Sequence, residues 1–481
     1  MSRDSSYAVD AVDGGVLKPL LALSGPIALA NLLQVGYTLT DTFWVGRLGG
    51  PAVSALGFSW AIVFAVLSLA GGFNVAGSVL VARHRGADDP ARVDRVAGQT
   101  VAFVGGVALL IAAAGYLATP TLLALVGATP GSEVYRMATA YTRVGFLGTP
   151  FVFGLYVYQG LLRGWGDSRT PLYVVGGSVV LNVLVDPFFV LGFRNNVLLG
   201  ALGLSAVERS LYAVTGFGGL GVEGAAVATV VSRGLGAAVA VGLLLSGRVG
   251  VNPSPSAFVP RRAVVVRLVR LGVPASVEQA THAVGVAVLT ALVATAGDPA
   301  VAAYSIGNRV LALLLLPTVA VAAGTQTMVG QRLGAERSDR VTRVVGTAAG
   351  ALGGYLVIAS AVTILLAEPI VSVLVTGDGS AAVVAHGAAY LRIVGVTFAF
   401  VGVFRVLKGA FRGGGATTAA MVASVASLVL LRVPAAYALV HWFGAAAGGV
   451  WYGIAFSNVA ICLLAAAWFR RGTWADRLPG R

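Results

Sequence analysis

Two aspartates, Asp41 and Asp186, lie inside long apolar stretches of the sequence. On insertion scales a carboxylate in the hydrocarbon core of a membrane costs roughly 2.5–3.5 kcal/mol, so each one indicates a function or a charged partner. Helical neighbours of the two acids, one or two turns away, are also polar: Gln34, Tyr37, Thr38 and Asn182. Two nearby carboxylates can share a proton, or they can bind a hard cation such as Na⁺ with amide and hydroxyl oxygens. These residues therefore predict a buried site for H⁺ or Na⁺.

The motifs of the common enzyme classes are absent or out of context. The chain contains no GxxxxGK[ST], HExxH or GxSxG motif. Gly216-x-Gly218-x-x-Gly221 has the spelling of a dinucleotide-binding loop, but it precedes a predicted membrane helix and not a helix of a βαβ unit. The single cysteine, Cys462, excludes an intrachain disulfide and a cysteine-based zinc site. We therefore expect no enzyme activity and no cofactor other than a coupling ion.

The composition is that of a polytopic membrane protein. Of the 481 residues, 57% are hydrophobic and 11% are charged, and the mean hydropathy is +0.87. A soluble domain carries about 25% charged residues, and a soluble chain of this size could not bury so much apolar surface. A formal charge of +14 would suggest nucleic acid in a soluble protein, whereas in a membrane protein it indicates arginine-rich cytoplasmic loops. We expect a lipid bilayer around the chain and no nucleic-acid partner.

Hydropathy and turn signals predict twelve membrane helices, each long enough to cross the hydrocarbon core. They fall at about 19–45, 52–82, 93–118, 134–162, 170–193, 219–246, 262–296, 300–333, 342–367, 383–411, 414–441 and 444–470.

Basic residues predict the orientation of these helices. Most lysines and arginines outside the spans fall in segments on the side of the N-terminus, and this set includes Arg163, Lys408 and Arg412. The opposite side holds only four: Arg47, Arg136, Arg194 and Arg209. Positive charge accumulates in cytoplasmic loops, so the pattern predicts a multi-pass protein of the cell membrane with both termini in the cytoplasm.

The two halves of the sequence are copies of each other. At an offset of 248 residues Pro26 matches Pro274, and at an offset of 249 Arg163 matches Arg412. Each half holds six spans, so the copies share one orientation and predict two six-helix bundles related by a pseudo-two-fold axis along the membrane normal. The expected parts are a cytoplasmic tail, an N-lobe, a cytoplasmic linker, a C-lobe and a second cytoplasmic tail, at 1–18, 19–246, 247–260, 261–470 and 471–481.

The repeat separates scaffold charges from functional ones. Arg143 and Arg392 occupy equivalent positions, which favours a structural role. Asp41 and Asp186 have no acidic counterpart, because the equivalent residues are Leu289 and Ala435. This asymmetry favours a functional role for the two acids over the alternative, in which Arg143 or Arg233 merely neutralises a buried carboxylate.

Several segments together resemble MATE (multidrug and toxic compound extrusion) transporters across nearly the whole chain. The segments are Gly25-Pro26, Asp41-Thr42 with Val45-Gly46-Arg47-Leu48-Gly49, Gln159-Gly160-x-x-Arg163-Gly164-x-Gly166-Asp167, Asn182-x-x-x-Asp186-Pro187 and Pro274-Ala275-x-x-Glu278-Gln279. The resemblance is greatest to the archaeal and bacterial branch with paired acids in the N-lobe.

This resemblance implies secondary active efflux, in which entry of H⁺ or Na⁺ drives export of amphipathic, often cationic, drug-like compounds by alternating access. It assigns cation coupling, with Na⁺ as one candidate, to Asp41, Asn182, Asp186 and Thr229. The substrate chamber is expected to include Gln34, Tyr37, Thr38, Tyr141 and Gln159. A kink at Pro26 makes the first helix a candidate moving part, and the expected functional unit is a monomer.

Three features depart from the family pattern. Arg233 replaces a glutamine common in the family, the external segment from Arg194 to Gly219 is longer than usual, and Glu278, the C-lobe candidate for coupling, lies nearer its proline than the acid of the branch that uses one. Two alternatives stay open. One is a flippase for lipid-linked oligosaccharides, with a wide cleft lined by Arg143, Arg309, Arg392 and Arg405; the other is a passive channel.

Overall fold

The computed structural model describes residues 15–194, 196–375 and 380–472, and all regular secondary structure in these ranges is helical. Most of the two predicted cytoplasmic tails, 1–18 and 471–481, lies outside the described residues.

Ten helices among the described residues are long and apolar enough to cross a membrane, and two bent pairs of helices raise the number of spans to twelve. The N-terminal half has α1 (Leu17–Gly46), α2 (Gly50–Gly86), α3 (Pro90–Leu125), α4 (Glu133–Trp165), α5 (Arg169–Leu191) and α8 (Val222–Leu245). The C-terminal half has α9 (Arg262–Ala294), the bent pair α10 (Asp298–Leu314) and α11 (Leu316–Gly334), α12 (Val341–Leu365), the bent pair α14 (Ser380–Gly395) and α15 (Phe398–Gly413), a span running from α16 (Thr417–Ala426) through the π-helical η3 (Ser427–Arg432) to α17 (Val433–His441), and α18 (Ala446–Arg470). Short helices connect them: α6 (Val197–Ala201), α7 (Ser205–Thr215), η1 (Pro255–Phe258), η2 (Ser338–Arg340) and α13 (Ala367–Ser372). The prediction of an all-α protein with twelve spans is confirmed.

Two of the predicted spans, 300–333 and 383–411, are broken instead of continuous. α10 and α11 meet at 45°, and Pro317 follows the break, where its missing N–H removes a helical hydrogen bond. α14 and α15 meet at 55°, and the Thr397 hydroxyl at that break donates to the backbone carbonyl of Val394 over 2.7 Å. A backbone break inside a membrane protein needs such replacement partners.

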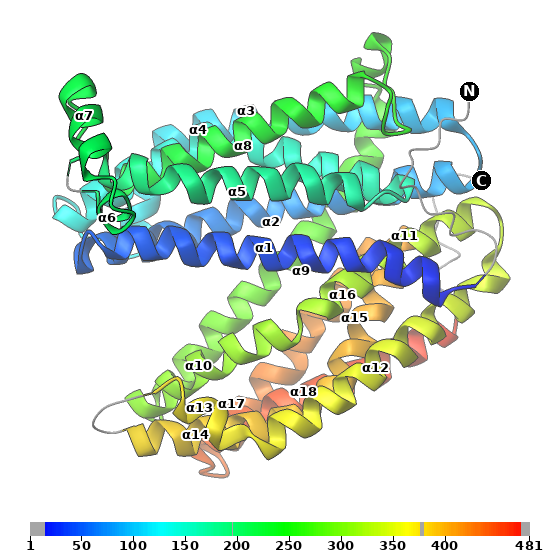
Figure 1. Ribbon diagram of the computed structural model, residues 1–481. Helices are drawn as coiled ribbons and strands as arrows, with labels where there is room; N and C mark the ends of the chain where they lie inside the picture. Colours follow the sequence, from blue (N-terminus) through cyan, green and yellow to red (C-terminus); the bar gives the residue numbers. More distant parts are fainter. Residues whose placement is uncertain (1–14, 195, 376–379, 473–481) are drawn as a thin grey trace.

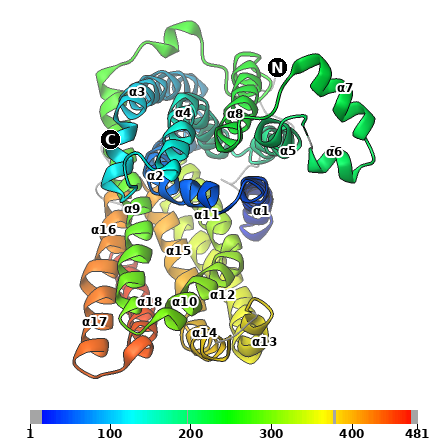
Figure 2. The ribbon, with the colours of Figure 1, turned by 90° about the vertical axis from the view of Figure 1, so that its left-hand side faces the viewer.

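The spans form two bundles that converge at one end and diverge at the other (Figure 1). The N-lobe consists of α1 to α5 and α8, and the C-lobe consists of α9 to α18. The described ends of the chain lie at the converging end, whereas α7, α10 and α14 lie at the diverging end (Figure 1). Figure 2 shows the two bundles from the diverging end, one above the other, with α1, α2, α9 and α11 where they meet.

The first helix of each lobe begins in the core of the other lobe. Leu20 and Leu23 of α1 are buried in the hydrophobic core of the C-lobe, and their repeat partners Leu268 and Leu271 of α9 are buried in the core of the N-lobe. This reciprocal exchange is what a pseudo-two-fold axis between the lobes requires, and it ties the lobes together at the converging end.

Glycines allow the lobes to touch there through their backbones. A Cβ atom on Gly86 at the end of α2 would collide with the carbonyl oxygen of Gln331 in α11. A Cβ atom on Gly334, the repeat partner of Gly86, would collide with the carbonyl oxygen of Arg83, the repeat partner of Gln331. Small residues permit such close approach of helices in membranes.

The same kind of contact joins helices inside each lobe. A Cβ atom on Gly160 of α4 would collide with the carbonyl of Asn74 in α2, and one on Gly409 of α15 would collide with the carbonyl of Ala322 in α11. Since each residue of one pair is the repeat partner of a residue in the other, the glycines seen in the repeat mark a duplicated helix crossing.

The predicted linker, 247–260, packs against the N-lobe. Val251 is fully buried in the N-lobe core, and the backbone N–H of Asn252 donates to Asp94 of α3 over 2.8 Å. η1 contacts α3 as well.

The segment predicted to be external, Arg194 to Gly219, contains α6 and α7, which lie at the diverging end (Figure 1). Asn196 is buried and closes the end of α5, since its side-chain amide donates to the Gly192 carbonyl over 2.6 Å. The carboxylate of Glu208 in α7 accepts from the backbone N–H of Asn196 over 3.0 Å. These bonds attach the inserted helices to the N-lobe.

Candidate functional site

A cavity of about 660 Å³ lies between the two lobes. Its wall in the N-lobe comes from α1, α2, α4, α5 and α8, and its wall in the C-lobe comes from α9, α11 and α15. The polar residues of the wall include every residue predicted for the substrate chamber: Gln34, Tyr37, Thr38, Tyr141 and Gln159. Thr229, predicted for cation coupling, also lines the cavity.

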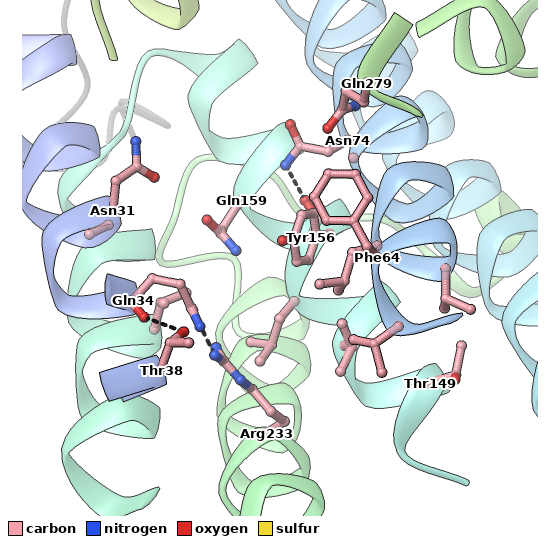
Figure 3. Close-up of a pocket in the computed structure, with 18 of the residues that line it drawn as sticks. Asn31, Gln34, Thr38, Phe64, Asn74, Thr149, Tyr156, Gln159, Arg233 and Gln279 are labelled. Carbon is pink, nitrogen blue, oxygen red and sulfur yellow. Dashed lines mark hydrogen bonds between the residues drawn. The ribbon is translucent and has the colours of Figure 1, made fainter. Parts of the chain in front are cut away.

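Arg233 and Tyr37 organise the N-lobe wall. The guanidinium of Arg233 crosses from α8 to α1, where it donates to the side-chain oxygen of Gln34 over 2.6 Å (Figure 3). Its Cζ lies 5.3 Å from the centre of the Tyr37 ring, within range of a cation–π contact. The hydroxyls of Tyr37 and Thr229 are hydrogen-bonded to each other over 2.8 Å. These contacts join α1 to α8.

Asp41, Asn182 and Asp186 lie behind this wall and do not line the cavity. Their exposed fractions are 3%, 2% and 0%. Asn182 and Asp186 share a face of α5 because they are one turn apart, and α5 packs against α1, which carries Asp41. The two carboxylates are close enough to interact electrostatically. The structure therefore brings these three predicted residues together. The fourth, Thr229, is hydrogen-bonded to Tyr37, which lies near both acids.

Five polar side-chain atoms of this group have no hydrogen-bond partner within the described part of the chain. They are Oδ1 of Asp41, both polar atoms of the Asn182 amide and both carboxylate oxygens of Asp186. Buried polar atoms are rarely left without a partner, because losing water costs free energy. Two carboxylates and an amide oxygen suit a shared proton or a hard cation such as Na⁺. No three His, Cys, Asp or Glu side chains gather as a transition-metal site among the described residues.

The two arginines considered as neutralising partners are engaged elsewhere. Arg233 binds Gln34, and Arg143 lies over the ring of Tyr116 at 5.2 Å. Within the described ranges, neither forms an ion pair with Asp41 or Asp186.

Glu278 is different, because it is held by two cations. The Glu278 carboxylate lies 2.9 Å from Nζ of Lys408 and 2.7 Å from Nη2 of Arg412, and only 3% of the residue is exposed. Ser424 donates a further, longer bond over 3.4 Å. Its carboxylate charge is therefore balanced within the protein, unlike those of the N-lobe acids.

Three basic residues counted with the cytoplasmic segments lie on the cavity wall instead. Arg163 belongs to α4, and Lys408 and Arg412 belong to α15. Their places near the cytoplasmic ends of predicted spans suggested loops, but the helices continue past them. The repeat contained a signal for this position, because Arg163 and Arg412 are repeat partners. A loop charge that only sets the topology need not recur at the same place in both halves.

Of the four arginines expected in a flippase cleft, only Arg405 lines the cavity. Arg392 is exposed and pairs with Glu368 over 3.0 Å, and Arg143 lies over Tyr116. Sequence reasoning also missed the neutral wall residues Asn74 and Tyr156, which are joined by a bond from the Asn74 amide to the Tyr156 carbonyl (Figure 3).

Comparison with known proteins agrees with the fold. The chain is 28% identical over 468 residues to the probable multidrug resistance protein YpnP of Bacillus subtilis, covering 97% of this chain and 98% of that one. A solved MOP superfamily transporter from Pyrococcus furiosus, whose binding pocket is described as of reverse polarity, superposes with a TM-score of 0.87 at 23% identity and covers 99% of this chain and 100% of its own. An outward-facing multidrug resistance MATE transporter gives a TM-score of 0.86 at 24% identity, covering 98% of this chain and 100% of its own. The MatE family model matches residues 26–188 and again 274–438, one match in each lobe. The chain therefore belongs to the MatE family of multi-pass membrane transporters.

Proposed function

We propose that this protein is a secondary active efflux transporter that exchanges H⁺ or Na⁺ for amphipathic organic compounds across the cell membrane. The observation that carries the proposal is the buried group of Asp41, Asn182 and Asp186 directly behind the wall of a cavity between two lobes. Five of its polar atoms have no hydrogen-bond partner among the residues that the structure describes. An ion bound by this group would stabilise one arrangement of α1 relative to α5. A transporter needs its ion and its substrate to favour different conformations.

Tyr37 is the proposed link between ion and substrate. Its hydroxyl is hydrogen-bonded to Thr229, and its ring lies beside Arg233. It is also close enough to Asp41 and Asp186 to interact with them electrostatically. An ion that draws Thr229 toward the acids would disturb these contacts and so change the shape of the wall. Gln34 and Thr38, on the same helix, would move with it.

Pro26 is the proposed hinge of this movement. α1 is a single helix through Pro26, but its residues before the proline pack in the C-lobe core, whereas the rest of α1 packs against α5. A proline lacks the N–H of a helical hydrogen bond, so bending there costs less than elsewhere. Bending at Pro26 would let the ion site alter the contact between lobes.

The remaining features of the proposal follow from the same arrangement. With both termini in the cytoplasm, the cavity would face outward, because the lobes diverge away from the described ends of the chain (Figure 1). The converging end, closed by the glycine contacts, supports alternating access over a passive channel. The cavity and the two lobes are complete in one chain, which supports a functional monomer.

Transport into proteoliposomes with separately imposed pH and Na⁺ gradients tests the proposal. Counterflow of a fluorescent substrate should respond to one of the two gradients in the wild-type protein and to neither in Asp41→Asn. Reciprocity requires that an ion that weakens substrate binding is itself bound more weakly with substrate present. Equal transport with and without gradients in the wild-type protein would contradict ion coupling.

A further inference from the structure

We propose that the substrates of this transporter carry negative charge: they are amphipathic organic anions with a carboxylate, sulfonate or phosphate group. The inference rests on the proposed transport function and changes the expectation of cationic substrates. Among the described residues, the cavity wall holds five arginine and lysine side chains and one histidine, His282, and its one acid is Glu278. The five cationic residues are Arg163, Arg233, Arg405, Lys408 and Arg412.

On the N-lobe side, two guanidiniums have no acidic partner within residues 15–194, 196–375 and 380–472. Arg233 donates to the neutral Gln34, and Arg163 donates to the neutral Gln159 over 2.8 Å. Nε of Arg163 is buried and has no hydrogen-bond partner within the described residues. A planar guanidinium with unused donors is suited to bidentate binding of a carboxylate or phosphate.

On the C-lobe side, one carboxylate faces three cations. Glu278 is bonded to Lys408 and Arg412, so it is occupied. Arg405, one turn before Lys408 on the same helix, makes no hydrogen bond or ion pair with any residue in the described part of the chain. Its charge is near those of Arg412 and Glu278. The C-lobe wall therefore keeps an excess of positive charge and at least one fully available guanidinium.

The N-lobe acids do not reverse this excess. Asp41 and Asp186 are buried and do not line the cavity. Even with both ionised, the basic side chains of the wall outnumber the acids in and behind it. A cationic substrate would meet arginines in both walls, and like charges in a partly dehydrated cleft repel each other strongly.

The apolar part of the wall provides for the body of the substrate. Phe64, Trp60 and Tyr156 line the N-lobe side together with Tyr141, and Figure 3 shows Phe64 and Tyr156 among the wall residues. The volume of about 660 Å³ is within the range of drug-sized ligand sites. Charged groups in both lobes together with aromatic rings on the N-lobe wall favour an amphipathic anion over a small inorganic one.

The test compares two dyes with one xanthene scaffold and opposite charge, 5-carboxyfluorescein and tetramethylrhodamine ethyl ester. Binding of each to the purified full chain in nanodiscs is measured by fluorescence anisotropy at one pH and ionic strength. We expect the anionic dye to bind at least about tenfold more tightly, and Arg405→Gln and Arg233→Gln each to weaken its binding about tenfold. Arg405→Lys, which keeps the charge, should restore most of the affinity, and Arg392→Gln outside the cavity should leave it unchanged.

The outcomes separate this inference from the transport proposal. Tighter binding of the cationic dye, or anionic binding that neither variant weakens, overturns the inference. If the cationic dye is then exported in response to an ion gradient, the transport proposal stands without it. Binding of neither dye overturns both.

A second arm identifies the source of the anion. Undecaprenyl phosphate in the nanodisc and a soluble aromatic carboxylate each compete with bound carboxyfluorescein. Stronger competition by the lipid indicates a lipid-linked phosphate, and stronger competition by the carboxylate indicates a free organic anion. Competition by either supports the anionic site, and competition by neither contradicts it.

Discussion

The buried acids of the two lobes differ in whether they have bonding partners. Asp41 and Asp186 are buried with carboxylate oxygens that have no hydrogen-bond partner in the described part of the chain, whereas Glu278 is bonded to Lys408 and Arg412. Removing a carboxylate charge should therefore impair transport when the acid is in the N-lobe, and lower the stability of the protein when the acid is Glu278 in the C-lobe.

Asp41→Asn and Asp186→Asn are expected to abolish gradient-driven transport while the protein stays folded. Neither change leaves a buried cation without its partner, so the melting temperature should move by only a few degrees. Transport assays in proteoliposomes and thermal unfolding in detergent measure the two effects. Leu289→Met, at the repeat position of Asp41, is the matched control and should transport normally. Full gradient-driven export by both aspartate variants would refute a coupling role for these acids.

Glu278→Gln is expected to destabilise the protein by about 2–4 kcal/mol, because it leaves two cations near one another without a carboxylate. The lower end of this range applies if water in the cavity screens them, since about one fifth of each cationic side chain is exposed. Glu368→Gln removes the acid of an exposed pair and should cost less than about 1 kcal/mol. A Glu278→Gln variant that melts with the wild-type protein would show that the cluster does not hold α9 to α15.

Helices of this protein meet through glycines and bend where their hydrogen bonds can be replaced. Gly86 and Gly334 let α2 and α11 touch at the converging end. The breaks between α10 and α11 and between α14 and α15 bend two C-lobe spans by 45° and 55°. The shape of the cavity thus depends on where helices approach and where they bend.

Gly86→Ala or Gly334→Ala is expected to push the lobes apart at the converging end, because the added Cβ atom meets a backbone carbonyl that cannot rotate away. Spin labels attached at Ala91→Cys and Ser338→Cys, in a Cys462→Ser background, should report a longer distance between the labels by pulsed electron paramagnetic resonance. Gly105→Ala, on α3 with open space around it, is the matched control. An unchanged distance distribution in both glycine variants would contradict a closing role for this contact.

The whole molecule has its basic loops at one end, and its two lobes diverge toward the other (Figure 1). This distribution predicts the orientation in the cell membrane. Cysteines introduced at Asp88 and Ser338, both exposed at the converging end, should not react with a membrane-impermeant thiol reagent in intact cells. They should react after the cells are permeabilised, and the buried Cys462 is replaced by serine to remove its signal. Rapid labelling in intact cells would invert the topology and place the cavity on the cytoplasmic side.

Features that depend on position along the chain could be predicted from the sequence alone. Twelve apolar segments, their duplication and the unmatched Asp41 and Asp186 can be recognised in one dimension, because the bilayer imposes a fixed span length and a repeat keeps a fixed offset. The polar neighbours Gln34 and Thr38 followed from helical spacing in the same way.

Which helical faces meet across the cavity became known from the three-dimensional arrangement of the helices. In that arrangement two spans are bent, Arg163 and Arg412 lie on the wall and Glu278 is paired with Lys408. Each of these depends on the rotation of a helix about its axis and on its contact with a helix far away in sequence. Hydropathy specifies neither, because in a span surrounded by lipid and protein both faces are largely apolar. The excess of positive charge in the cavity, which bears on the choice of substrate, therefore emerged only when the two lobes were set against each other.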